Sequence, residues 1–122
     1  MQNLVNWFEI PAKDLGRAKK FYGAVLDLEI NEVDMFGTKM AFFPTDGSNV
    51  SGAIVQGEDY HPSPEGALVY LNGGNDLGNM LSKVEGAGGT VILPKTQISP
   101  EMGYFAMFLD TEGNKMALHS VG

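Results

Sequence analysis

The chain contains an internal repeat, and this repeat limits its possible folds more than any other feature. "DLGRAKKFYGAVLDLEI" begins at Asp14, and "DLGNMLSKVEGAGGTVI" begins at Asp76. A second match follows in each half, with "FFPTDG" from Phe42 and "FLDTEG" from Phe108. Similar segments at a fixed spacing indicate a duplicated supersecondary unit. We therefore expect two similar halves that are related by a pseudo-two-fold axis.

Each half also predicts the same order of elements. In the first half, the apolar run from Leu4 to Ile10 predicts a strand, and Asp14 is a good N-cap for a helix with an apolar stripe of Leu15, Ala18, Tyr22 and Val25. Three strands follow, in "LEINEVDMFG", "TKMAFFP" and "VSGAIVQ". The second half has a strand in "ALVYLN", a helix in "NDLGNMLSKVEGAGG", and strands in "TVILPKTQI", "GYFAMFLD" and "KMALHS". Both halves therefore predict β-α-β-β-β.

The segment between the halves differs from both. Residues 57–66, "GEDYHPSPEG", are polar and contain two Pro and two Gly, which is typical of a linker. We expect one domain over residues 1–122, with a first unit at 1–56, a linker at 57–66 and a second unit at 67–122. The linker is either a plain connector or a lid over a site.

Charge and composition exclude several classes of function. The net charge is −7, whereas nucleic-acid binding requires clustered Lys and Arg to neutralise phosphates. The chain has no Cys, so a disulfide, a Cys-type zinc site and a thiol nucleophile are excluded. No signal peptide or membrane-spanning apolar run is visible. We expect a cytoplasmic protein without nucleic-acid or membrane partners.

The whole chain resembles the vicinal oxygen chelate superfamily, which includes glyoxalase I, bleomycin and fosfomycin resistance proteins and extradiol dioxygenases. The resemblance rests on "FEIPAKDLGRAKKFYGAVLDLEI" near the start and "YFAMFLDTEGNKMALHS" near the end. It implies an α+β fold in which two tandem βαβββ units form a curled mixed sheet, or cup, with the helices on its convex face. It also implies a homodimer.

Glyoxalase I-like members of that superfamily hold a divalent metal in the cup with His and Glu side chains. By this resemblance, the ligand positions fall on Trp7, near Gly52, on Ala67 and on Ala117. None of these side chains can bind a metal. We therefore predict no metal and no cofactor, with one divalent metal in a rebuilt site as the alternative.

Strand alternation extends the candidate site beyond these positions, because residues two apart share one face of a strand. If Trp7 and Ala117 face the cup, then Glu9 and His119 do too, while Phe8 and Leu118 face the helices. The candidate ligand-binding residues are therefore Trp7, Glu9, Ala67, Val69, Ala117 and His119. Which faces the aromatic residues of the third and seventh strands take is not determined, because the register depends on turn lengths.

Glu9 and His119 are also the candidate catalytic residues, as an acid–base pair. Each has a structural alternative: an ion pair of Glu9 with Lys39, Lys115 or His119, and a hydrogen-bonded histidine at the rim. Trp7 is either a pocket wall or part of the core. The remaining acidic candidates, Asp46, Asp110 and Glu112, are interpreted as structural turn residues.

Three functions fit these features. The first is a metal-free member of the superfamily that binds a small organic molecule in the cup. The second is an enzyme, such as a lyase, isomerase or dioxygenase, with a rebuilt metal site or metal-free acid–base chemistry at Glu9 and His119. The third is an interaction protein without a small-molecule site, in which the cup is filled by its own side chains.

Overall fold

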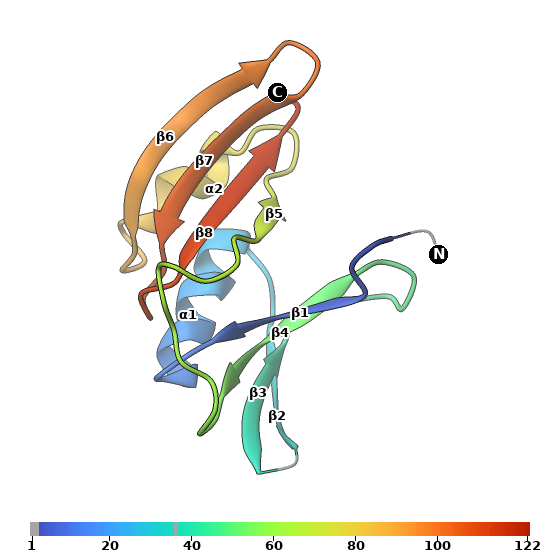
Figure 1. The fold of residues 1–122 in the computed structure, drawn as a ribbon, viewed down its shortest axis with the longest axis vertical. Helices are drawn as coiled ribbons and strands as arrows, with labels where there is room; N and C mark the ends of the chain where they lie inside the picture. The colour runs from blue at the N-terminus through green and yellow to red at the C-terminus, as the bar shows by residue number, and fades with distance from the viewer. Residues whose placement is uncertain (1–2, 36) are drawn as a thin grey trace.

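Two four-stranded sheets and two helices make up the computed structural model, which describes residues 3–35 and 37–122 (Figure 1). The first unit comprises β1 (Trp7–Pro11), α1 (Leu15–Leu26), β2 (Asn31–Met35), β3 (Thr38–Phe42) and β4 (Ser51–Gln56). The second comprises β5 (Tyr70–Asn72), α2 (Gly78–Val84), β6 (Thr90–Ser99), β7 (Gly103–Leu109) and β8 (Lys115–Ser120). The predicted α+β class with two βαβββ units is confirmed.

The two sheets have the same topology. Their strand orders are β1-β4-β3-β2 and β5-β8-β7-β6. In each unit the first strand lies parallel to the fourth, and the other neighbours are antiparallel. A parallel pair needs a long crossover, which the helix and two strands between them supply. The repeated topology is the structural counterpart of the sequence repeat.

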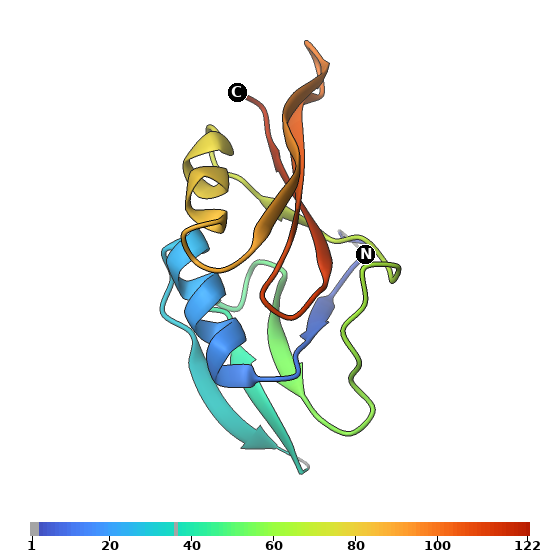
Figure 2. The same ribbon diagram turned by 90° about the vertical axis from the view of Figure 1, so that its left-hand side faces the viewer.

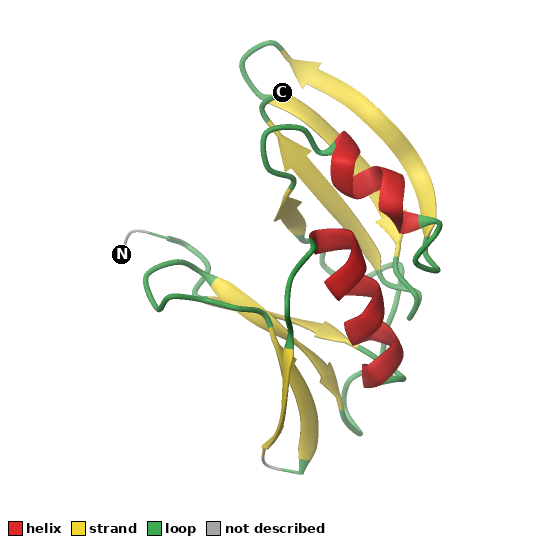
Figure 3. Ribbon diagram, turned by 180° about the vertical axis from the view of Figure 1, so that it is seen from behind, coloured by secondary structure: helices red, strands yellow, loops and turns green. Residues whose placement is uncertain are grey.

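The helices cover one side of the sheets. Figure 2 shows α1 and α2 stacked along one side of the molecule, and Figure 3, from behind, shows both in front of the strands. The helices contact each other, and the buried side chains of both units form one cluster beneath them. Neither helix of the described chain is long and apolar enough to cross a membrane.

Helix α1 begins and ends where its sequence indicates. The Oδ1 atom of Asp14, the predicted N-cap, accepts a hydrogen bond of 3.1 Å from the N–H of Arg17. The predicted apolar stripe is buried, together with Phe21. The last helical residue is Leu26. Asp27 follows it as the C-terminal cap, with a left-handed φ of 55°.

The ends of several strands differ from the predicted ranges. The first strand starts at Trp7 and not at Leu4, which is 90% exposed. The fifth strand covers only Tyr70–Asn72 and does not start at Ala67. Its length is set by its parallel partner, because β8 pairs with it only at Ala117–His119.

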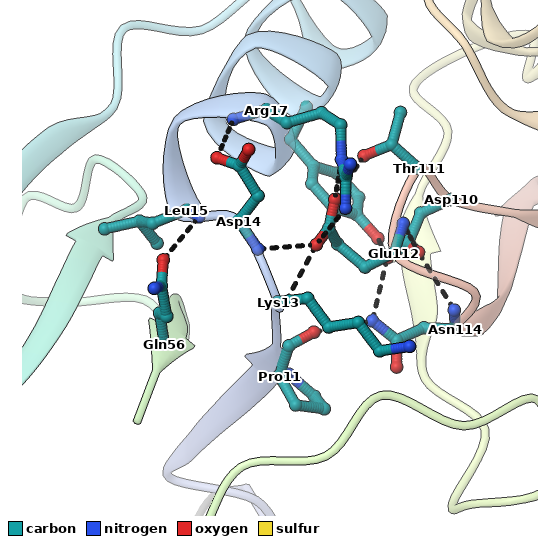
Figure 4. A network of polar contacts seen from close by, with 11 residues as sticks. Pro11, Lys13, Asp14, Leu15, Arg17, Gln56, Asp110, Thr111, Glu112 and Asn114 are labelled. Atoms are coloured by element: carbon teal, nitrogen blue, oxygen red, sulfur yellow. Dashed lines mark hydrogen bonds and ion pairs between the residues drawn. The ribbon is translucent and has the colours of Figure 1, made fainter. Parts of the chain in front are cut away.

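The turn between β7 and β8 fastens the second unit to the first (Figure 4). The Oε1 atom of Glu112 accepts hydrogen bonds of 2.8 Å from the N–H groups of Lys13 and Asp14, at the start of α1. Its Oε2 atom lies 2.7 Å from Nε of Arg17. We call Arg17, Tyr22, Asp110, Glu112 and Asn114 the interunit clasp.

Asp110 and Asn114 complete this clasp. The Tyr22 hydroxyl donates a hydrogen bond of 2.6 Å to Oδ2 of Asp110, and both groups are buried. The amide of Asn114 donates to the same carboxylate and, at 2.8 Å, to the carbonyl of Pro11. Asp110 and Glu112 are therefore structural, as predicted for turn residues, and they also hold the two units together, which was not predicted.

Candidate functional site

Each sheet has one face that the helices do not cover, and we call it the outward face. On β1, Ile10 is buried and Phe8 packs against the core beneath the helices, whereas Trp7 and Glu9 are exposed on the other face. Glu9 pairs with Ala53 of β4, and strand neighbours in register share a face. The predicted placement of Trp7 and Glu9 on one face is therefore confirmed.

The second sheet shows the same alternation on β8. Met116 and Leu118 belong to the core cluster, so Lys115, Ala117 and His119 take the outward face. His119 pairs with Phe105 of β7 and with Asn72 of β5. The expected sharing of one face by Ala117 and His119 is confirmed.

The register also decides the faces of the aromatic residues. Phe42 pairs with Ala53, on the outward face of the first sheet, while the next residue, Phe43, is buried in the core. In the second sheet Phe105 lies outward, and Phe108 lies in the core. These assignments depend on the register between paired strands, and the register cannot be read from the amino-acid sequence alone.

The strand register places the fourth-strand ligand position, predicted near Gly52, more closely. Gly52 pairs with Phe8 on the helix side of the sheet. A Cβ atom at Gly52 would lie 2.3 Å from the Phe8 carbonyl oxygen and 2.8 Å from its ring, so only glycine fits this close approach. The outward positions beside it are Ser51 and Ala53, one residue to either side.

The fifth strand also differs from expectation. Ala67 is exposed and precedes β5, and Val69 packs partly against the core. The outward residues of β5 are Tyr70, which pairs with Ala117, and Asn72. Tyr70 was missed in the sequence, although the alternation in "LVYLN" would have indicated it once its pairing with β8 was known.

The residues at the expected metal positions do not fit a metal ion. The outward positions on β1, β4, β5 and β8 carry Trp7, Ser51 or Ala53, Tyr70 and Ala117. Divalent cations in such sites are bound by imidazole and carboxylate groups, and this set contains neither. Among the described residues, no group of three or more His, Cys, Asp or Glu side chains could hold a metal.

Glu9 has a different partner from those expected. Its Oε1 atom accepts a hydrogen bond of 2.7 Å from the Tyr60 hydroxyl, in the linker. This hydrogen bond raises the pKa of Tyr60 above its usual value, and burial and the nearby charges of Glu9 and Asp59 act in the same direction. The ion pair with Lys39, Lys115 or His119 is therefore not observed among the described residues.

His119 is held by the backbone. Its Nε2 atom lies 2.7 Å from the carbonyl oxygen of Met102. Because a carbonyl can only accept, Nε2 carries the proton in this contact. The environment matches the structural alternative, a hydrogen-bonded histidine at the rim.

The two acid–base candidates line different cavities. Glu9 lines a cavity of about 180 Å³ together with His61, Ala67 and Lys115. His119 lines another of about 860 Å³, with Tyr70 and Met102. Within one chain, the cavities therefore do not bring Glu9 and His119 together for proton transfer.

A third cavity lies between the two units and is largely apolar. Its volume is about 880 Å³, and its wall combines Phe8, Phe43 and Val50 of the first unit with Val69 and Met80 of the second. On the outward face, Trp7 is 43% exposed and meets Phe42 edge to face, with ring centroids 5.8 Å apart. Trp7 is thus a surface aromatic, available to a ligand, and does not fill the core.

Comparisons with known proteins agree with this architecture. Residues 4–118 match the family model described as Glyoxalase/Bleomycin resistance protein/Dioxygenase superfamily. No curated protein sequence matches the chain. Among solved structures, a hypothetical protein from S. aureus is 24% identical, with a TM-score of 0.71 and coverage of 98% of this chain and 99% of that one.

Two further solved structures carry functional names. Glyoxalase I from Leishmania major is 15% identical, with a TM-score of 0.70 and coverage of 98% of this chain and 88% of that one. A fosfomycin resistance protein from Listeria monocytogenes is 16% identical, with a TM-score of 0.66 and coverage of 98% and 91%. At these identities the likeness shows a shared fold.

Proposed function

Because the chain belongs to the Glyoxalase/Bleomycin resistance protein/Dioxygenase superfamily, we propose that it binds a small organic molecule against the outward faces of its sheets, without a metal. The observation that carries this proposal is the set of side chains at the outward positions of β1, β5 and β8. An indole, a phenol and a methyl group stand there, in Trp7, Tyr70 and Ala117. Trp7 on the first sheet and Tyr70 on the second each suit stacking with a flat ring, since aromatic side chains dominate apolar binding sites.

We also propose that the protein is a homodimer, as the resemblance implies, and that the second subunit completes the binding site. The support lies in large apolar side chains that one chain leaves exposed. Several belong to the sheets or to the segments beside them: Val5, Trp7, Val33, Val50, Leu68, Tyr70, Ile92, Ile98 and Met102. Apolar exposure on this scale marks an interaction surface. The lack of Cys suits a reducing compartment, and the cytoplasm remains the proposed location.

The test combines metal analysis with a ligand screen. Protein purified without chelator, and again after soaking in nickel, zinc, manganese or iron(II), is expected to contain almost no bound metal. Quenching of fluorescence from Trp7, the single Trp, is then expected to identify small-molecule ligands. About one metal per chain, lost in Glu9→Ala or His119→Ala, would overturn the proposal and establish a rebuilt metal site. A screen without hits would instead favour an interaction protein.

The enzymatic alternative uses Glu9 and His119 for metal-free proton transfer. It has less support, because Glu9 binds Tyr60, His119 binds the Met102 carbonyl, and the two side chains line separate cavities. A general acid and a general base must both reach the substrate. Turnover of a screened ligand that is abolished in both Glu9→Gln and His119→Asn would establish this alternative.

A further inference from the structure

Two aromatic residues, Trp7 and Phe42, lie on the same outward face of the first sheet as Glu9, and Tyr60 contacts the Glu9 carboxylate from the linker. We call Trp7, Glu9, Phe42 and Tyr60 the aromatic–carboxylate cluster. Trp7 and Glu9 are two residues apart on β1, so they lie about 7 Å apart along one face. Phe42 meets the Trp7 ring edge to face at 83°. Tyr60 reaches Glu9 from the linker with a hydrogen bond of 2.7 Å.

The negative charge in this cluster has no ion-pair partner. The ion pairs among the described residues are Arg17–Glu112, Lys19–Glu32 and Lys95–Asp76, none of which includes Glu9. Within residues 3–35 and 37–122, the one side-chain group that donates a hydrogen bond to Glu9 is the neutral hydroxyl of Tyr60. Lys39 pairs with Gln56 in the strand register, on the helix side of the sheet.

Among the residues that the structure describes, Lys115 is the one Lys or Arg side chain that lines the same small cavity as Glu9, and His61 lines it too. Neither side chain forms an ion pair with Glu9. The carboxylate therefore has no direct ion-pair partner in the described part of the chain, and a cationic ligand can supply one. A chain of net charge −7 adds a field that concentrates cations near its surface.

We propose that the aromatic–carboxylate cluster recognises a flat organic cation, such as an N-alkylated aromatic amine, and this inference rests on the proposed small-molecule function. The indole of Trp7 is the aromatic side chain that binds cations best, and Glu9 supplies the opposite charge beside it. A neutral ring stacked on Trp7 would remove water from Glu9 without replacing it by a partner, which costs free energy. An anion would be repelled as well.

Three probes of similar shape and different charge test this proposal: N-methylquinolinium, neutral quinoline and the anion 2-naphthoate. Binding to the full chain is followed at neutral pH through the indole N–H signal of Trp7 in a two-dimensional NMR spectrum. N-methylquinolinium is expected to bind about tenfold more tightly than quinoline, and 2-naphthoate more weakly still.

Two charge variants separate the cluster from the overall field of the protein. Glu9→Gln is expected to weaken N-methylquinolinium about tenfold. It should not weaken quinoline, because a neutral amide costs less to desolvate than a carboxylate. Asp34→Asn is the matched control, because it removes the same charge from the exposed helix side of the sheet, and it is expected to change affinity less than about twofold. Lys115→Met removes the competing cation and is expected to strengthen N-methylquinolinium binding.

The outcomes separate this inference from the proposed function. Equal affinity for the three probes, or equal effects of Glu9→Gln and Asp34→Asn, would overturn the cation preference. The cation preference would also be overturned if the three probes fail to bind while the fluorescence screen finds ligands of other chemistry. The proposed binding of a small molecule would remain supported in that case. Failure of both the probes and the screen would overturn the proposed function itself.

Discussion

Glu112 shows how much of this fold depends on single residues. Its side chain is fully buried, pairs with Arg17 and accepts the N–H groups that open α1. Burial opposes its charge, but the hydrogen bonds from Arg17, Asp14, Thr111 and Lys13 prevail and lower the pKa of Glu112 below its usual value. One carboxylate therefore accepts hydrogen bonds from the backbone N–H groups just before α1 and also links the second unit to the first.

The lowered pKa of Glu112 predicts acid sensitivity. A carboxyl group with a depressed pKa in the folded protein contributes stability above its unfolded pKa, about 4.3, and loses it as the pH falls through the folded pKa. Glu112→Gln is expected to lower the free energy of unfolding at neutral pH by about 1–3 kcal/mol. It should also flatten the loss of stability below about pH 4.3, measured by urea unfolding across pH. An unchanged pH profile would contradict this role.

Gly52 is a second residue with a specific structural requirement. A methyl group there would meet the Phe8 backbone, so Gly52→Ala is expected to destabilise the protein by about 1–3 kcal/mol. Gly66→Ala is the control, because a Cβ atom added at Gly66 would meet nothing within 4 Å and its φ is not positive. Its effect should stay within about 0.5 kcal/mol. Thermal unfolding of both variants measures the difference, and equal effects would disprove the close approach.

Among the elements, α1 is defined most clearly by local chemistry. Asp14 caps its start, and Asp27 ends it in a left-handed conformation. The second helix is shorter, and the Oδ1 atom of Asp76, the counterpart of Asp14 in the repeat, accepts a hydrogen bond of 2.8 Å from the N–H of Gly78 at its start. Leu77 and Val84 pack into the core beside it. The two similar stretches of sequence therefore begin their helices with an aspartate at the same place in the repeat, and they differ in how the helices end.

Substitutions at the two ends of α1 are expected to act in opposite directions. Asp14→Ala removes the N-cap and should lower stability by about 1 kcal/mol. Asp27→Gly relieves the left-handed strain and should raise stability by up to about 1 kcal/mol. Urea unfolding measures both, and a stabilising Asp14→Ala would show that the clasp alone holds the start of the helix.

For the whole molecule, the separate sheets and their exposed apolar residues support the proposed dimer. Light scattering during gel filtration is expected to give twice the chain mass of 13.1 kDa. Tyr70→Glu places a charge on an exposed outward position and should produce monomers, because a charge buried at an interface is costly. Lys20→Glu on the exposed side of α1 is the control and should remain dimeric. A wild-type monomer at working concentration would overturn the dimer.

Part of the candidate site could be predicted, and part could not. The alternation of Trp7 with Glu9, and of Ala117 with His119, follows from the period of a strand and is confirmed. The fourth-strand position was predicted only to within one residue of Gly52, and the register shows that Ser51 and Ala53 are the outward residues there. Tyr70 was missed, and Tyr60 was not anticipated as the partner of Glu9. Each of these points concerns a contact between segments far apart in the chain.

The sequence by itself determined the repeat, the order of the elements, the ends of α1 and the absence of suitable ligands at the expected metal positions. These features depend on residue type and on neighbours within a few positions, so they can be read locally. The tertiary structure decided the register of β4 and β5, the faces of Phe42 and Phe105, and the separation of Glu9 from His119. The physical reason is that strand pairing and side-chain packing join residues tens of positions apart, and a shift of one residue reverses every face.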